Sequence, residues 1–135
     1  MARKPIVAPD SRPASAPLRP ESDVIFDVEI ERGMLHFVLA NIGAAPAHAV
    51  RVKLDKAVRD LAGLRVNDNA LYTNLEFLAP GRRVRLLVDS LAGYVERRQP
   101  MKFGVKLQWS DDQDRLLSRS IAHDLTAWTQ LRDTL

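Results

Sequence analysis

Three histidines are the residues of this 135-residue sequence best suited to bind a metal ion or transfer protons: His36, His48 and His123. A metal site needs three or four ligands in a compact group. Each histidine falls in a different predicted strand, without a convergent set of carboxylates, so the sequence favours surface or rim histidines over a metal site. The chain has no cysteine, which excludes disulfides and thiolate ligands.

Signatures of catalysis are missing from the rest of the sequence. It contains no G-x-S-x-G, phosphate-binding loop, G-x-G-x-x-G or H-E-x-x-H motif, and nothing pairs a nucleophile with a base. The alternating row Asp27, Glu29 and Glu31 is typical of the solvated face of an edge strand. Asn67-Asp68-Asn69 lacks the ligand spacing of a calcium loop and indicates a turn. The sequence therefore predicts a protein that is not an enzyme and needs no cofactor.

Basic residues offer the more specific candidate site. In a sandwich whose third, sixth and seventh strands are neighbours, one sheet face would carry the residues Arg51, Lys53, Lys102, Lys106 and Arg119, with Arg115 as a further candidate. Such a face attracts an acidic protein, a nucleic acid or another polyanion, and the competing interpretation is a solvated surface. Phe103 and Trp109 point inward in this arrangement, which argues against stacking on single-stranded nucleic acid.

Strand-like alternation dominates the elements that would position these residues. The predicted strands are 24–31, 34–41, 48–54, 71–78, 82–89, 101–109 and 115–125. Between the second and third lies an elbow, 41–47, where Gly43 frees the backbone, Asn41 tolerates a left-handed conformation and Pro46 removes a ladder donor. We therefore predict an all-β fold, an immunoglobulin-like antiparallel sandwich of about seven strands, with the elbow as one of its corners.

The connecting segments carry weaker signals. Residues 55–70 fit neither the helical nor the strand period and predict an irregular crossover between the sheets, and residues 90–100 predict a loop. Arg119 stands between Leu117 and Ile121, which leaves the inward face of the last strand ambiguous. Residues 126–135 predict a short helix on the sandwich or a frayed end.

Residues 1–23 form a tail of different composition, with prolines at 5, 9, 13, 17 and 20. This density of proline defeats helices and sheet ladders and predicts a disordered segment. Pro17-Leu18-Arg19-Pro20 matches the P-x-x-P pattern of some docking motifs, so the tail is either a plain tether or a docking segment. The folded domain is expected over residues 24–125.

Composition is that of one soluble domain, with a formal charge of +3 and a sequence pI near 9.6. No run approaches the roughly 20 apolar residues of a membrane helix, and no signal peptide follows Arg3 and Lys4. The sequence as it stands predicts a cytoplasmic protein, whereas a piece of a larger exported protein would look the same.

The elbow and a later turn resemble bacterial immunoglobulin-like domains of the cell-adhesion-related kind, which are close to fibronectin type III domains in architecture. The resemblance rests on Asn41, Gly43, Ala47, Val50 and Val52, on Leu78, Pro80 and Gly81, and on Trp109, Asp111 and Asp112 in the final hairpin. It covers residues 24–125 and implies a binding or spacer module without an active site. We therefore expect a non-enzymatic protein-interaction or structural module with a protein partner. The alternative is a polyanion-binding protein that uses the basic sheet face. The sequence specifies no oligomeric state.

Overall fold

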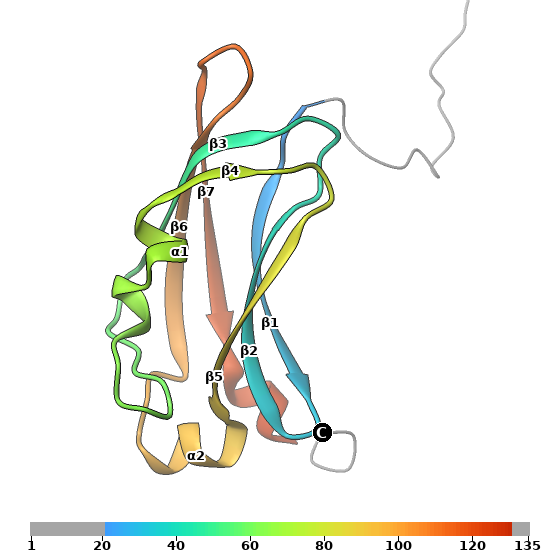
Figure 1. Ribbon diagram of the computed structural model, residues 1–135. Coiled ribbons are helices and arrows are strands. Elements are labelled where there is room, and N and C mark those ends of the chain that lie inside the picture. Colours follow the sequence, from blue (N-terminus) through green and yellow to red (C-terminus); the bar gives the residue numbers. More distant parts are fainter. Residues whose placement is uncertain (1–20, 131–135) are drawn as a thin grey trace, which may run out of the picture.

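Two antiparallel sheets pack face to face in the computed structural model, which describes residues 21–130 (Figure 1). Sheet A has the order β1-β2-β5, and sheet B has the order β4-β3-β6-β7. The strands are β1 (Val24–Glu31), β2 (Met34–Asn41), β3 (Ala47–Leu54), β4 (Leu75–Leu78), β5 (Arg83–Ser90), β6 (Lys102–Ser110) and β7 (Leu116–Asp124). The predicted all-β sandwich of about seven strands is confirmed.

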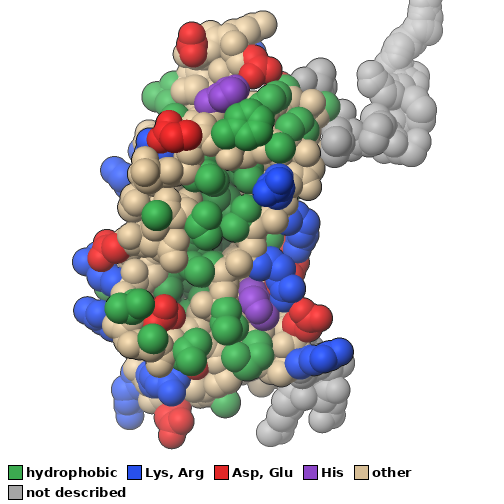
Figure 2. Space-filling view, in the orientation of Figure 1, with side chains coloured by type: hydrophobic (Ala, Val, Ile, Leu, Met, Phe, Trp, Pro, Cys, Tyr) green, Lys and Arg blue, Asp and Glu red, His purple; other side chains and the backbone are tan. Residues whose placement is uncertain are grey.

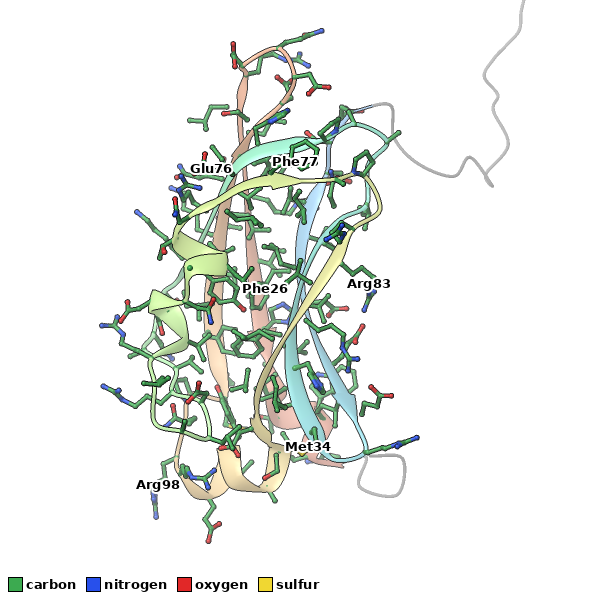
Figure 3. The ribbon with its side chains drawn as sticks, in the orientation of Figure 1. Phe26, Met34, Glu76, Phe77, Arg83 and Arg98 are labelled. Carbon is green, nitrogen blue, oxygen red and sulfur yellow. The ribbon has the colours of Figure 1, made fainter. Side chains whose placement is uncertain are left out.

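Alternating side chains build the core between the sheets. On β1 the inward row begins with Val24, Phe26 and Val28, which are 0–3% exposed. On β6 the buried row is Phe103, Val105, Leu107 and Trp109. Phe26 lies between the two sheets, with its ring centroid 5.3 Å from that of Phe37 (Figure 3). Period-two patterning thus fixes which face of each strand is buried.

Asn41 organises the corner where the chain passes from sheet A to sheet B. Its side chain is fully buried and makes four hydrogen bonds. Oδ1 accepts from the N–H groups of Asp23 and Gly43, and Nδ2 donates to the carbonyls of Ala45 and Leu78. Because one amide satisfies four backbone groups from separate segments, it holds the elbow closed. The predicted elbow is indeed a corner of the sandwich.

Residues 21–23, which the sequence assigns to the tail, are hydrogen-bonded to the elbow. Ile42 N–H donates to the carbonyl of Asp23, and Ala44 N–H donates to that of Glu21. A Cβ atom on Gly43 would lie 2.0 Å from the Glu21 oxygen, so this close approach requires glycine. Ser22 accepts a hydrogen bond from the Trp109 indole at 3.0 Å. The rest of the predicted tail, with its P-x-x-P motif, lies outside the described residues.

Two short helices replace predicted extended or loop segments. Helix α1 (Ala70–Thr73) occupies the first half of the predicted strand 71–78, and Asn69 Oδ1 caps it by accepting from Leu71 N–H. Helix α2 (Leu91–Glu96) begins after Ser90, whose hydroxyl accepts from Gly93 N–H.

Two 3₁₀ turns complete the helical elements of the described residues. The turn η2 (Val66–Asp68) lies in the irregular crossover, and η3 (Leu125–Gln130) is the short helix offered as one alternative for the C-terminal segment. Residues 131–135 lie outside the described part. Across residues 21–130, no helix combines the length and apolarity that a membrane crossing requires.

Candidate binding surfaces

The outer face of sheet B brings four of the five predicted basic residues together. Strands β3, β6 and β7 are neighbours in that sheet, as expected. The basic face is the part of this surface that carries Arg51, Lys53, Lys102 and Lys106. Lys53 lies directly opposite Lys106 on the neighbouring strand.

These four cations differ in their partners. Arg51 forms an ion pair with Glu76 at 2.9 Å and donates to the Leu75 carbonyl at 3.2 Å. Lys102 lies opposite Asp124, whose pKa is lowered by hydrogen bonds from Thr126 and by the charge of Lys102. Lys53 and Lys106 have no ion pair among residues 21–130. Like charges directly opposite each other in a sheet are destabilising, so an anion would relieve this pair.

Small residues make the surface beside this lysine pair shallow. Gly104, Ser120 and Ala122 line a hollow together with Lys53 and Lys106. Asp55 lies at the same hollow, where its carboxylate accepts a hydrogen bond from Gly104 N–H at 2.8 Å. The hollow in the basic face is therefore shallow and mixed in charge, which suits a broad acidic surface better than a small enclosed ligand.

Arg119 is not part of the basic face, contrary to the prediction. It pairs across the sheet with Leu107, whose side chain points into the core. Its guanidinium forms an ion pair with Asp23 at 2.7 Å and donates to the Val24 carbonyl at 3.2 Å. The inward row of β7 mixes cationic and apolar residues because it faces both the core and the edge of β1. Arg115, the further candidate, pairs with Asp111 beside the last hairpin.

The three histidines lie on separate strands, β2, β3 and β7, and each has a different neighbour. His36 Nδ1 lies 3.2 Å from Arg85, and His48 Nε2 lies 2.8 Å from Asp112 Oδ1. His123 Nε2 donates to the Phe26 carbonyl at 3.0 Å. Within residues 21–130, no group of three or more histidine, aspartate or glutamate side chains has the arrangement of a metal site.

The acidic row of β1 is occupied by ion pairs across sheet A. Glu29 pairs with Arg83 and, at 3.4 Å, with Arg85. Glu31 pairs with Arg85 at 2.8 Å, and this arginine lowers the pKa of Glu31. These long side chains cross the middle strand, where Val38 is only 1% exposed although it faces outward. The row is therefore a charged cover of the sheet.

A second candidate surface, which the sequence did not reveal, follows from the unequal sheets. Sheet A has three strands and sheet B has four, and their edge strands β5 and β4 diverge from the turn at residues 79–82 (Figure 1). We call the gap between these two edges the open side. Figure 2 shows hydrophobic side chains along it. On the two edge strands, the half-buried apolar residues packed against the core are Leu75, Val84 and Leu86.

The opposite side of the sandwich is closed. There the edge strands are β1 and β7, and β1 presents the carbonyls of Val24 and Phe26 to its free edge. Arg119 and His123 of β7 donate hydrogen bonds to these two carbonyls. Such capping blocks strand addition at that edge of β1. On the side between β4 and β5, the edge of β5 pairs with no strand of residues 21–130 and lies beside the half-buried side chains Val84 and Leu86.

Comparison with known proteins gives a family of uncharacterised role. Residues 10–129 match the model of a family described as "Domain of unknown function (DUF8453)". No curated protein and no solved structure matches the chain. The match spans most of the 135 residues, so the chain belongs to this family.

Proposed function

We propose that this member of the DUF8453 family is a non-enzymatic protein-interaction module with an immunoglobulin-like fold. The observation that supports this most strongly is the open side, where sheet A lacks a strand to face β4. Half-buried Val84 and Leu86 remain there next to an unpaired strand edge. Exposed apolar surface beside free backbone groups is a common feature of protein-binding sites.

The resemblance to bacterial immunoglobulin-like domains is part of this proposal. The corner supports this resemblance, because the chain passes there from one sheet to the other: Asn41 ends a strand of sheet A and Val50 lies in a strand of sheet B. Domains of this kind present binding surfaces on their sheets, edges and end loops. An interaction role therefore needs no catalytic group.

The test is affinity capture with the full chain from a lysate of the source organism, at low and at moderate salt. Apolar contacts and backbone hydrogen bonds weaken little with salt, so the proposal expects one protein to be retained at both concentrations. Absence of any retained protein at either salt concentration would contradict the proposal.

A second candidate function is polyanion binding by the basic face. The observation that favours it is the direct opposition of Lys53 and Lys106, neither of which forms an ion pair within residues 21–130. Binding of this type releases counterions and collapses as salt rises. Fluorescein-labelled heparin is a suitable probe. Loss of its binding in the variant Lys53→Gln/Lys106→Gln, together with a steep salt dependence, would support this second function.

A further inference from the structure

The register of sheet A determines which backbone groups β5 offers to the open side. Asn41 N–H donates to the carbonyl of Arg82, and the two strands continue from there with Leu39 opposite Val84 and Phe37 opposite Leu86. Hydrogen-bonded pairs alternate in an antiparallel ladder. The N–H and C=O groups of Arg83, Arg85 and Leu87 therefore point away from β2, toward the open side.

One contact already occupies the lower end of this edge. Leu61, in the crossover after β3, donates its N–H to the carbonyl of Val88 at 2.8 Å. Above this contact, no strand of the described residues pairs with the free edge of β5. The edge thus accepts a backbone donor at its end, and the outward-pointing backbone groups of Arg83, Arg85 and Leu87 remain available along residues 83–87.

The other three edges are less suitable for a strand. The edge of β1 has its Val24 and Phe26 carbonyls capped by β7. The inward row of β7 contains Arg119 and His123, which would leave an added strand without a uniformly apolar neighbour. Strand β4 has only four residues. Strand β5 has eight residues, and the half-buried residues Val84 and Leu86 on its inner face are apolar.

The side chains of β5 also determine which residues a strand paired with it should contain. Inward positions beside Val84 and Leu86 call for apolar residues that would complete the core. Outward positions beside Arg83 and Arg85 call for acidic residues, because opposite charges on neighbouring strands attract. Figure 3 shows Arg83 directed away from the sandwich, on the outer side of sheet A.

Strand β1 shows that acidic side chains on an apolar–acidic alternating strand can pair with the same two arginines. Its sequence, VIFDVEIE, alternates apolar inward residues with mostly acidic outward ones. Glu29 and Glu31 reach Arg83 and Arg85 from two strands away, across β2. A strand directly beside β5 would bring its carboxylates to these guanidinium groups across one strand spacing of about 4.8 Å.

Two other occupants fit less well. A second copy that paired its β5 with this β5 would place the arginine side chains of two identical strands next to each other on the same sheet face. Their like charges would repel. The N-terminal segment has prolines at 5, 9, 13, 17 and 20, so it holds no run long enough to pair fully.

We infer that the free edge of β5 binds an extended segment of a partner protein, in which apolar and acidic side chains alternate, as a fourth strand of sheet A. This inference rests on the proposed interaction function and gives it a surface and a ligand chemistry. Backbone pairing with Arg83, Arg85 and Leu87 supplies affinity, and the alternating side chains supply specificity.

The experiment measures binding of a labelled peptide to the full chain by fluorescence anisotropy. The probe is an eight-residue peptide with the sequence of β1, VIFDVEIE, between soluble flanks. Its counterpart carries lysine at the three acidic positions. The inference expects the acidic peptide to bind at least about tenfold more tightly than the lysine peptide, the equivalent of one charge-assisted contact.

Two proline variants locate the binding edge. Leu87→Pro removes a backbone N–H that points to the open side and leaves the ladder to β2 intact. Ser120→Pro is the matched control on β7. Leu125 N–H donates to the Met101 carbonyl, and hydrogen-bonded pairs alternate along the two strands from there. The N–H of Ser120 therefore points away from β6, toward the free edge of β7. We expect Leu87→Pro to weaken peptide binding about tenfold, and Ser120→Pro to leave it unchanged.

A measurement on the unmutated protein covers the case in which Leu87→Pro fails to fold. Hydrogen exchange, followed by NMR, should slow at the amides of Arg83, Arg85 and Leu87 when the acidic peptide is added, and not at Ser118 and Ser120. Peptide binding that Leu87→Pro retains, or protection that appears along β7 instead, would overturn the inference. So would a wild-type dimer that Leu87→Pro converts to monomer, because a second copy would then occupy the edge.

Failure of this inference is distinguishable from failure of the proposed function. If the chain retains a protein from lysate at moderate salt but Leu87→Pro retains it equally, the interaction function stands and the β5 edge is wrong. If no protein is retained, the proposed function itself fails.

Discussion

His123 Nε2 lies 3.0 Å from the main-chain carbonyl oxygen of Phe26, on the opposite sheet of the sandwich. Together with the bond from Arg119 to Val24, this contact ties the edge of β1 to β7 and closes one side of the fold. The side between β4 and β5 has no equivalent contact among the described residues. This asymmetry is the structural basis of the proposed interaction role.

Arg119 should contribute to stability, whereas the surface lysines should not. Arg119→Met removes the ion pair with Asp23 and the donor to Val24, and we expect the free energy of unfolding to fall by about 1–3 kcal/mol. Lys53→Met is the control. Because it removes one of two opposed lysines, we expect a change within about 0.5 kcal/mol. Urea denaturation measures both. Equal effects would contradict the inward placement of Arg119.

Two buried tyrosines should respond oppositely to loss of their hydroxyl groups. Tyr72 is 2% exposed and its hydroxyl has no hydrogen-bond partner in the described part of the chain, and burial raises its pKa. Tyr94 is also buried, but its hydroxyl donates to the Pro100 carbonyl. We expect Tyr72→Phe to be neutral or to stabilise by about 1 kcal/mol, and Tyr94→Phe to destabilise by about the same amount. Thermal unfolding of the two variants measures both effects. An equal loss of stability in Tyr72→Phe and Tyr94→Phe would contradict this prediction.

The Asn41 amide should not tolerate replacement by a carboxylate. Asn41→Asp exchanges a donor for an acceptor in front of the Ala45 and Leu78 carbonyls and buries a charge. We expect a loss of about 3 kcal/mol or more of unfolding free energy. Asn74→Asp, at an exposed helix end, is the matched change and should cost little. A small effect of Asn41→Asp in urea denaturation would mean that the corner does not depend on this side chain.

Asp111 should make stability depend on acid pH. Its carboxylate accepts hydrogen bonds from the backbone N–H groups of Arg115 and Gln113 and from the Arg115 side chain. These bonds lower the pKa of Asp111, and the bond from the Arg115 backbone N–H has the largest effect. Because the folded-state pKa lies below the unfolded value, the stabilisation is present above about pH 4 and is lost as the pH falls through the folded-state pKa.

The variant Asp111→Asn should therefore show a flatter decline of the melting temperature between about pH 4 and pH 2 than the wild type. Asp68→Asn, at an exposed aspartate in η2, should follow the wild-type curve. Parallel curves for the wild type and Asp111→Asn would show that these hydrogen bonds do not perturb the carboxyl group.

Most of the strands could be predicted because their apolar residues alternate over eight or nine positions. The corner could be predicted from Asn41, Gly43 and Pro46, since each restricts or frees the backbone in a known way. Helices α1 and α2 could not, because four to six residues are too few for a helical period. Their signals were the caps Asn69 and Ser90, which are also ordinary loop residues.

The candidate site was only partly readable. Lys53 and Lys106 follow from alternation within regular strands. Arg119 was misplaced because its strand is an edge, where an inward side chain can reach the backbone of the other sheet instead of the core. The open side depends on which sheet each strand joins, and the sequence of β5 carries no information about the number of strands beside it.

The most direct test of the interaction function captures partners in parallel with the wild-type full chain, Leu87→Pro and Ser120→Pro, at moderate salt. We expect the wild type and Ser120→Pro to retain the same protein, and Leu87→Pro to lose it while remaining folded. Retention of that protein by all three chains would contradict binding at the edge of β5, and retention by none would contradict the interaction function itself.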